Sequence, residues 1–325
     1  MASVVLPKIL ELGPQYGYNP VRGLQNISNP SAGCQRIIVE FSSPNIAKEF
    51  HAGHLRSTII GSFLANLYEG SGWDVVRMNY LGDWGRQYGL LAVAWEKYGD
   101  EEAFQANPIK HLFDIYVQIS ADFKPEEEAY KAAGKRGEDT SVLEGQGLLG
   151  EAKAYFKRME DGDEKALRLW RRFRELSIEK YKQTYARLNI VFTDYSGESQ
   201  VNKQSMELAE SVLAEKGISK KDQGATIVDF REHGNKKLDV AILRNRNGTS
   251  NYLLRDVGAA IQREDTYHFD KMIYVVMSEQ ETHLRRLFKI MELMGGQYSD
   301  ISKKMQHVTF GRVRVQTSQN FPDAR

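Results

Sequence analysis

Residues 37–61 read IIVEFSSPNIAKEFHAGHLRSTIIG, and this stretch decides the fold of the chain. Its opening residues, IIVEFS, are rich in β-branched and apolar side chains, which is typical of a strand buried on both faces. Pro44 ends the strand. From Leu55 onward, Ile59, Phe63 and Leu67 and the small Ser62 and Ala65 recur at helical spacing, so a helix is predicted to begin near His51.

The turn His51-Ala52-Gly53-His54 is a candidate phosphate-binding site. Unpaired N–H groups and the positive end of the dipole attract anions to a helix N-terminus, and Gly53 would let an anion approach the backbone closely. His51 and His54 could donate hydrogen bonds to it. Two histidines at this spacing are also compatible with helix capping or with half of a zinc site. No second half of a zinc site is evident, since Cys34 is the single cysteine and the remaining histidines are scattered.

Composition limits the function classes. The chain has 325 residues, and 44 Lys and Arg against 43 Asp and Glu give a net charge of +1. Any nucleic-acid contact must therefore come from local patches. One cysteine permits no intramolecular disulfide and favours a reducing compartment. Residues 1–12 lack the features of a signal peptide, and no run approaches the ~20 apolar residues of a membrane span.

Strands and helices are predicted to alternate along the chain. Further strands are expected at residues 73–81, 238–244 and 271–276, and further helices at residues 84–98, 253–264 and 279–294. Such alternation predicts an α/β fold, a Rossmann-like doubly wound parallel sheet with helices on both faces.

A long, mainly helical insertion is expected between the two halves of the sheet. One apolar stripe comprises Leu112, Ile115, Tyr116, Ile119 and Phe123, and another comprises Ile178, Tyr181, Tyr185 and Leu188. Residues 134–150, which contain charges and five glycines, are expected to form a loop between these helices.

Three motifs in a fixed order carry a family resemblance. VEFSSPNIAKEFHAGHLRSTIIG, LGDWGRQYG at residues 81–89 and YLLRDVGAA at residues 252–260 resemble the catalytic core of arginyl-tRNA synthetases of the eukaryotic cytoplasmic type. HAGH is similar to the His-Ile-Gly-His signature of class I synthetases. The resemblance covers residues 37–314. It implies a class I catalytic fold, ATP-dependent activation of L-arginine, transfer to the terminal adenosine of tRNA(Arg) and a cytoplasmic location.

The resemblance implies how ATP is held. In amino-acid activation the substrate carboxylate attacks the α-phosphorus of ATP, so the protein must position the reactants and stabilise charge. His51, Gly53 and His54 are expected to bind the phosphates of ATP with Mg²⁺, and Lys48 to assist catalysis. His283 is a candidate ATP contact. From the residues alone, Lys48 could equally be a surface lysine and His283 a solvated residue at a helix start. No metal site and no tightly bound cofactor are expected.

Arginine makes a particular demand on the site. Its guanidinium is a planar, permanently charged fork that carboxylates recognise by bidentate pairing. Glu40 lies in an otherwise apolar strand and should have a cationic partner, which could be the substrate or a structural arginine.

The resemblance places Glu40, Tyr252 and Asp256 around the guanidinium. It places Ser43, Pro44, Asn45, His54 and Gln280 around the amino-acid backbone. The alternative for Tyr252 and Asp256 is packing and dipole stabilisation at a helix start.

Other polar groups are harder to assign. Asp83 lies at a strand end, where a turn or cap would suit it, and its role stays open. Two basic groups are candidates for tRNA contact: Arg168, Arg171, Arg172 and Arg174, and Lys236, Lys237, Arg244 and Arg246. Such clusters are more often solvated faces than phosphate sites.

The expected organisation is an N-terminal segment at residues 1–35, a catalytic domain at 36–314 and a divergent tail at 315–325. The catalytic domain comprises halves at 36–100 and 224–314 and the helical insertion at 101–223. The N-terminal domain, second signature loop and anticodon-binding domain of the family are not recognised, so a truncated product with impaired activity is expected. The alternatives are a non-catalytic arginine- or ATP-binding fragment and a different nucleotidyl-transferring enzyme.

Overall fold

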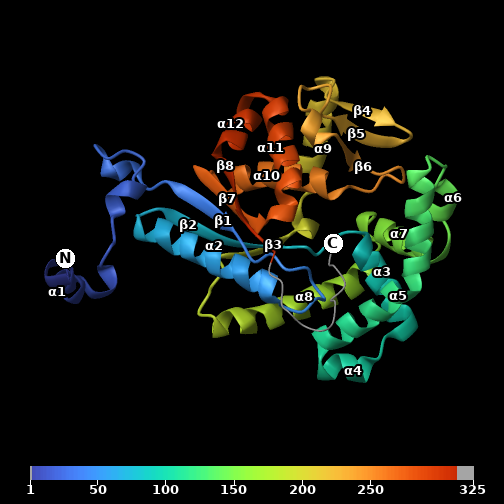
Figure 1. Cartoon of the computed structure of the whole chain (residues 1–325), viewed down its shortest axis with the longest axis horizontal. Coiled ribbons are helices and arrows are strands. Elements are labelled where there is room, and N and C mark those ends of the chain that lie inside the picture. Colours follow the sequence, from blue (N-terminus) through green and yellow to red (C-terminus); the bar gives the residue numbers. More distant parts are fainter. Residues whose placement is uncertain (1, 313–325) are drawn as a thin grey trace.

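The computed structural model describes residues 2–312, in which a parallel sheet is flanked by helices (Figure 1). The strands of this sheet are β1 Arg36–Glu40, β2 Asp74–Leu81, β3 Asp194–Gly197, β7 Lys271–Met277 and β8 Met305–Phe310. Their order is β3-β2-β1-β7-β8, and every neighbouring pair is parallel. The predicted doubly wound α/β fold is confirmed. The strand order reverses between β1 and β7, and such folds bind ligands at the carboxyl ends of the strands beside that point.

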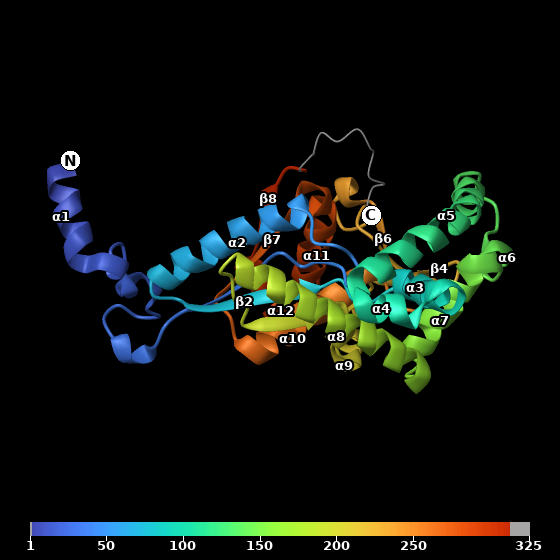
Figure 2. The same ribbon diagram turned by 90° about the horizontal axis from the view of Figure 1, so that it is seen from below.

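Alternate residues of β1 face different layers. Ile37 and Val39 belong to a core shared with α2 (Ala52–Gly70) and the helical insertion. Ile38 belongs to a core shared with α10 (Tyr252–Tyr267), α11 (Glu281–Met294) and α12 (Gly296–Lys304). Figures 1 and 2 show α2 on one side of the sheet and α10 and α12 on the other. Because strand side chains alternate, Glu40 points to the same layer as Ile38.

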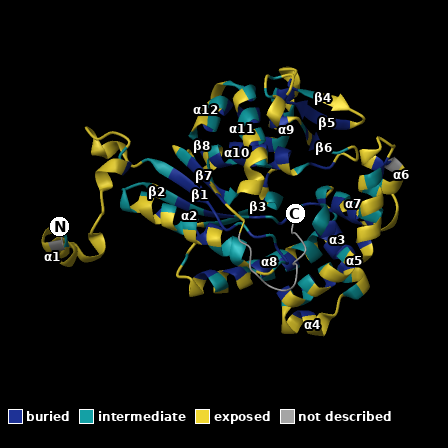
Figure 3. Cartoon of the chain, viewed as in Figure 1, coloured by how far each residue is buried: buried dark blue, intermediate teal, exposed yellow. Residues whose placement is uncertain are grey.

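Small side chains pack α2 against the sheet. The buried residues of α2 are Ser57, Thr58, Gly61 and Ala65. The apolar residues whose spacing predicted the helix, Ile59, Phe63 and Leu67, are 57%, 65% and 53% exposed (Figure 3). The helix prediction is confirmed, although these residues do not form its buried face.

Substituting Gly61→Ala should lower the free energy of unfolding by about 1–3 kcal/mol, because an added methyl group overpacks the interface. A Cβ at Gly61 would lie 2.2 Å from the Cβ and Cγ of Phe41. Urea unfolding measures the change. Gly70→Ala is the matched control, because a Cβ at that end of α2 would meet no atom within 4 Å. Equal effects of the two substitutions would show that close packing at Gly61 is unimportant.

The segment expected to form the insertion, residues 101–223, is mainly helical. Helix α3 Arg86–Tyr98 precedes it, and its own helices are α4 Glu101–Ala106, α5 Pro108–Lys135, α6 Ser141–Glu144, α7 Gly147–Glu160, α8 Glu164–Arg187 and α9 Lys203–Glu215. The expected loop at residues 134–150 is wrong in part, since it contains α6 and the start of α7. The reason is a tertiary cap: the Glu126 carboxylate accepts hydrogen bonds from the N–H groups of Leu148 and Leu149 at 3.2 and 3.1 Å.

A separate antiparallel sheet corrects a second expectation. The strand predicted at residues 238–244 was expected to continue the parallel alternation. Instead β6 (Val240–Arg244) pairs antiparallel with β5 (Ala225–Asp229), which pairs antiparallel with β4 (Ser219–Asp222). Gln223 and Gly224 join β4 to β5 with φ of 45° and 84°. A two-residue turn with both φ positive favours a tight hairpin, so these strands pair with each other instead of joining the parallel sheet.

The N-terminal helix α1 (Ala2–Leu12) extends away from the rest of the chain and is largely exposed (Figures 1 and 3). Short 3₁₀ helices connect other elements: η1 Gly13–Gln15, η2 Pro20–Gly23, η3 Pro30–Ala32, η4 Glu198–Gln200, η5 Lys236–Leu238 and η6 Ser278–Gln280. Within residues 2–312, no helix has the length and apolar character needed to cross a membrane. The expected tail at residues 315–325 lies outside the described residues.

Candidate active site

A strained loop joins β1 to α2 beside the point where the strand order reverses. Ser42, Ser43 and Ala47 have φ of 69°, 44° and 60°, a region that residues with a Cβ seldom adopt. Backbone strain of this kind persists only where surrounding contacts hold it, and it is concentrated at ligand sites. The predicted site residues Ser43, Pro44, Asn45 and Lys48 all lie in this loop.

Helix α8 of the insertion holds the loop. The Tyr181 hydroxyl lies 2.7 Å from the Asn45 carbonyl oxygen and 2.6 Å from that of Lys48. The Ser177 hydroxyl accepts a hydrogen bond from the Ala47 N–H at 3.0 Å. The sequence indicated Tyr181 only as part of an apolar stripe. Its polar role was missed because its hydrogen-bond partners are distant in sequence.

The end of β2 fixes the other side of the loop. The Gly82 N–H donates to the Pro44 carbonyl at 3.2 Å, and the Tyr80 N–H donates to Ser43 Oγ at 3.3 Å. A Cβ on Gly82 would lie 2.0 Å from Asn45 Oδ1, so any larger residue there would displace the Asn45 amide. Ser43, Pro44 and Asn45 are thereby placed at the carboxyl ends of β1 and β2.

His51 and His54 form a reciprocal cap at the start of α2. His51 Nδ1 accepts from the Gly53 N–H at 3.1 Å, and His54 Nδ1 accepts from the His51 N–H at 3.3 Å. The rings are stacked with centroids 3.8 Å apart. Because a backbone N–H only donates, both Nδ1 atoms lack a proton, and each neutral ring carries its proton on Nε2. Capping therefore fixes the tautomer that leaves Nε2–H as the free donor of each ring.

Burial keeps this pair neutral. It lowers the pKa of His54 to about 3, and the neighbouring His51 and Lys48 lower it further. Burial also lowers the pKa of His51 and of Lys48. Lys48 is partly buried, with Nζ 5.9 Å from the ring centre of Tyr116, so it is not an ordinary surface lysine.

Acid should destabilise the chain through His54. Its folded pKa of about 3 lies below the unfolded value of 6.5, so between these values the unfolded chain binds more protons and the free energy of unfolding falls as the pH falls. From pH 6.5 to about pH 5 the loss attributable to His54 is about 2 kcal/mol. Urea unfolding of wild type and of His54→Asn, each at both pH values, measures this loss. It is the pH-dependent fall in stability of wild type minus that of His54→Asn. Substitution of the exposed His268 by asparagine is the control, and an equal change in both variants would refute the assignment.

A second cluster forms around Asp256 on α10. The Asp256 Oδ2 lies 2.5 Å from His283 Nε2, and its Oδ1 accepts from the Tyr80 hydroxyl at 3.3 Å. The ring of Tyr252, one turn before Asp256, lies 4.7 Å from the His283 ring. Three predicted site residues are thus brought together. His283 was expected as an ATP contact, but its hydrogen bond is to a residue expected to bind the guanidinium.

The end of β7 connects the two clusters. A Cβ on Gly53 would lie 3.9 Å from Met277 Sδ, so the last residue of β7 adjoins the histidine cap. Ser278–Gln280 follows and leads into α11, which carries His283. The predicted contact Gln280 is exposed at this junction.

Glu40 has the cationic partner that its apolar strand predicted. Arg263 Nη2 of α10 lies 2.7 Å from Glu40 Oε2, and both side chains are 6% exposed. The structural arginine that the sequence left open is therefore present. Burial raises the pKa of Glu40 to about 7, Arg263 is the strongest opposing influence, and the charge of Asp256 raises it further.

Glu198, at the start of η4 beside the end of β3, is a further candidate for the site that the sequence did not indicate. Its Oε2 lies 2.8 Å from Arg255 Nη2. Burial raises the pKa of Glu198 to about 7, with Arg255 opposing and Asp256 adding to the rise. No motif marks it, because its relevance depends on β3, which is only four residues long.

Asp83 joins the sheet to the insertion. Its fully buried carboxylate lies 2.5 Å from Arg174 Nε of α8 and accepts hydrogen bonds from Ser199 N–H and Oγ at 2.9 and 2.7 Å. Burial raises the pKa of Asp83, and these hydrogen bonds oppose the rise. The open question about Asp83 is answered by a structural role.

The two basic groups are largely paired within the chain. Arg171 binds Glu164, Arg172 binds Glu101, Arg244 binds Glu210 and Arg246 lies near Asp139. These pairs favour the interpretation of the groups as charge-balanced surfaces. A phosphate backbone would have to compete with the carboxylates already bound.

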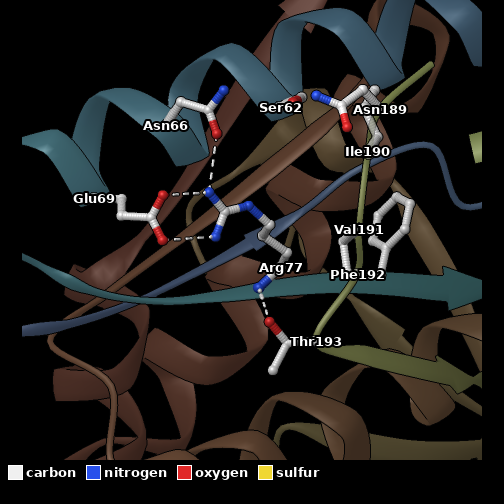
Figure 4. Close-up of a pocket in the computed structure, with 9 residues that line it drawn as sticks. All are labelled: Ser62, Asn66, Glu69, Arg77, Asn189, Ile190, Val191, Phe192 and Thr193. Carbon is white, nitrogen blue, oxygen red and sulfur yellow. Dashed lines mark hydrogen bonds and ion pairs between the residues drawn. The ribbon is translucent and has the colours of Figure 1, made fainter. Parts of the chain in front are cut away.

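A cavity of about 310 Å³ lies away from these clusters, between the later turns of α2 and the segment before β3 (Figure 4). Arg77 is its most basic lining residue, but its guanidinium already binds Glu69 Oε2 at 2.9 Å and Asn66 Oδ1 at 2.9 Å. No predicted site residue lines it. Among residues 2–312, no group of three or more His, Cys, Asp or Glu side chains is arranged to hold a metal ion.

Comparisons with known proteins agree with this geometry. The family model described as tRNA synthetases class I (R), catalytic domain, matches residues 23–323, and so reaches into the segment expected to diverge. The cytoplasmic arginine–tRNA ligase of Saccharomyces cerevisiae is 53% identical over 97% of this chain and 47% of its own length. A probable mitochondrial arginine–tRNA ligase of Homo sapiens is 41% identical over 97% of the chain and 49% of its own length.

Solved structures give the same relationship. The arginyl-tRNA synthetase of Plasmodium falciparum superposes with a TM-score of 0.65 at 25% identity, covering 89% of this chain and 45% of that one. The chain spans about half the length of the curated relatives it matches. The extent of the family match and these relatives together show that the chain belongs to the class I tRNA synthetases of the arginine type, in their catalytic domain.

Proposed function

We propose that this chain activates L-arginine with ATP to form arginyl-adenylate and transfers the arginine to the terminal adenosine of tRNA(Arg). One observation carries the proposal: a neutral pair of histidine donors and a cluster of carboxylate and aromatic side chains lie at the same edge of the sheet, connected through the end of β7. The first suits a polyphosphate, and the second suits a guanidinium.

The histidine cap would bind ATP, supplied as its Mg²⁺ complex. The Nε2–H groups of His51 and His54, the free N–H groups of α2 and the Lys48 ammonium can all stabilise negative charge on the phosphates. Neutral histidines remain donors without first losing or gaining a proton. A Cβ on Gly53 would lie 2.9 Å from His51 Cε1, so Gly53 also leaves room for the ring that caps the helix.

The Asp256 cluster would bind the substrate guanidinium. Asp256 and Glu40 supply carboxylates, and Tyr252 supplies a flat ring that is 48% exposed. Ser43, Pro44, Asn45 and Gln280 would surround the amino-acid backbone and orient its carboxylate toward the α-phosphorus. His283 would release Asp256 or share it when arginine binds, and its candidate contact with ATP remains part of this proposal.

We further propose a cytoplasmic location, since relatives named as cytoplasmic in two yeasts match at 53% and 47% identity. Relatives named as mitochondrial match as well. The catalytic domain is assigned to residues 36–314, with sheet halves at 36–100 and 224–314 on either side of the insertion at 101–223.

Arginine-dependent exchange of pyrophosphate into ATP tests the proposal on the 325-residue chain, with and without tRNA(Arg). Lysine and citrulline are the comparison substrates, because the first lacks the planar fork and the second lacks the charge. Exchange that requires arginine would establish the activation step of the proposed activity. Arginine binding in calorimetry without exchange would instead support the alternative of a non-catalytic arginine-binding fragment. Absence of both would refute the proposal.

A further inference from the structure

We propose that Arg263 is a positioning residue for arginine selectivity, which favours the ionised form of the Glu40 carboxylate and directs it at the guanidinium subsite that Glu40 shares with Asp256. The inference rests on the proposed function and deepens it. It explains why a second arginine lies beside a carboxylate that is expected to recognise the substrate arginine.

The Arg263 guanidinium is held in an aromatic cage. Its Cζ lies 4.4 Å from the ring centre of Tyr80 and 5.8 Å from that of Tyr274. Tyr80 belongs to β2 and Tyr274 to β7, the two strands that flank β1, and Tyr274 is the direct register partner of Glu40. Contacts with a ring from each of these strands restrict the movement of the guanidinium. The cage therefore fixes the cation that faces Glu40.

Helix α10 presents Arg263 and the predicted substrate contacts on one face. Tyr252, Asp256 and Arg263 fall within about 40° of one another at about 100° per residue. Exposure falls along the helix, from Tyr252 to Asp256 one turn later and then to the buried Arg263. A substrate guanidinium near Asp256 would then approach Glu40 from the side opposite Arg263, so that Glu40 lies between two guanidinium groups.

The charge of Glu40 depends on its surroundings. The charged and titratable groups near it are Arg263 and Asp256 of α10, His283 of α11, Tyr80 of β2 and Tyr274 of β7. Among the described residues, Arg263 is the one ion-pair partner of Glu40. Without that cation, burial and Asp256 would both favour the protonated carboxyl.

Protonation of Glu40 would change what the pocket accepts. A carboxylate attracts the cationic guanidinium of arginine, whereas a protonated carboxyl can donate a hydrogen bond to the neutral carbonyl oxygen of citrulline. Arg263 therefore matters for discrimination between these two ligands as well as for affinity. A purely structural ion pair would affect folding without changing this preference.

The test compares wild type, Arg263→Gln and Arg263→Lys. Carbon-13 NMR of labelled glutamate carboxyl groups follows the titration of Glu40, with Glu40→Gln identifying the signal. Calorimetry gives the dissociation constants of arginine and citrulline from about pH 6 to about pH 9. Circular dichroism confirms that each variant is folded.

In Arg263→Gln, we expect Glu40 to titrate at a higher pH than in wild type. Arginine should bind about tenfold more weakly near neutral pH and recover as the pH rises, while citrulline should not lose affinity. Arg263→Lys retains the positive charge but lacks the planar guanidinium fork. Its Glu40 titration and its arginine affinity should lie between those of wild type and Arg263→Gln. If Arg263→Gln does not fold, a partial loss in Arg263→Lys that recovers with rising pH carries the same meaning.

An unchanged Glu40 titration in Arg263→Gln would overturn the inference. A shifted titration with unchanged arginine affinity would also overturn it, because the ion pair would then have only a structural role. If the wild-type chain binds no arginine, the proposed function fails and Arg263 has no role in selectivity. The Glu40 titration still shows whether Arg263 controls the ionisation of Glu40, because it can be measured without arginine, so the two failures are distinguishable.

Discussion

Replacing His54 by alanine is expected to lower arginine-dependent pyrophosphate exchange by about 10²–10³-fold, the range observed when one preorganised donor to a transition-state charge is removed. The substitution removes an Nε2–H donor and also the Nδ1 acceptor that binds the His51 N–H. His51 would lose its stacked partner, whose ring centre lies 3.8 Å away. Both donors at the start of α2 are therefore affected by one substitution. If the wild-type chain shows no exchange, ATP affinity measured by calorimetry replaces it as the readout.

Two control variants separate donation from capping. Asparagine is a good N-cap residue, so His51→Asn keeps an acceptor for the Gly53 N–H but lacks the Nε2–H donor. It should therefore lose exchange while retaining stability. Asp100→Ala removes the cap of α4, where Asp100 Oδ1 accepts from the Ala103 N–H, and should cost about 1 kcal/mol of stability without affecting exchange. Full activity in His51→Asn would show that the histidines act only as caps.

The first strand, the turn and α2 could be predicted because their signals are local. A β-rich run, a proline, a glycine beside two histidines and a helical repeat all occur within residues 37–61. The same stretch supplied the motif that indicated the family. Even here the sequence did not indicate which face of α2 is buried, since Ile59, Phe63 and Leu67 are exposed while Gly61 and Ala65 pack against the sheet.

The missed strands lack such signals. β3 reads DYSG and β8 reads MQHVTF, and neither shows a clear apolar alternation. They are strands because they add to the edges of a sheet that already exists, β3 beside β2 and β8 beside β7. The hairpin of β4 and β5 spans the expected boundary at residue 223 and was not predicted, because its turn, Gln223-Gly224, is a weak sequence signal that becomes clear only from its φ values.

Contacts within the site could be predicted where the chemistry of one residue requires a particular kind of partner. Glu40 in an apolar strand required a cation, and the structure supplies Arg263. Sequence could not identify that cation, because Arg263 reaches Glu40 only when α10 packs across the sheet. Tyr181 was missed for the same reason, since its hydroxyl contacts backbone carbonyl groups of a loop that is distant in the sequence. Long-range partners follow from the fold and not from local pattern.

Replacing Asp83 by alanine is expected to lower the free energy of unfolding by about 3–5 kcal/mol, because removing one partner of a buried ion pair leaves the other uncompensated. Asp83 is fully buried, and the side chain of its partner Arg174 is 14% exposed. The substitution also removes the acceptor for Ser199 N–H and Oγ. Three segments, the end of β2, α8 and η4, would lose their common contact. Urea unfolding monitored by circular dichroism measures the loss.

The same helix provides the matched control. Arg171 of α8 pairs with Glu164, but these side chains are 47% and 62% exposed, so Arg171→Ala should change stability by no more than about 1 kcal/mol. Asp83→Asn keeps the size of the side chain and an acceptor for Ser199 but lacks the charge. Its loss of unfolding free energy should lie between those of Asp83→Ala and Arg171→Ala. Equal losses in Asp83→Ala and Arg171→Ala would contradict the structural role. A graded series would show that burial, and not the number of ion pairs on α8, decides how strongly the insertion is attached to the sheet that carries the site.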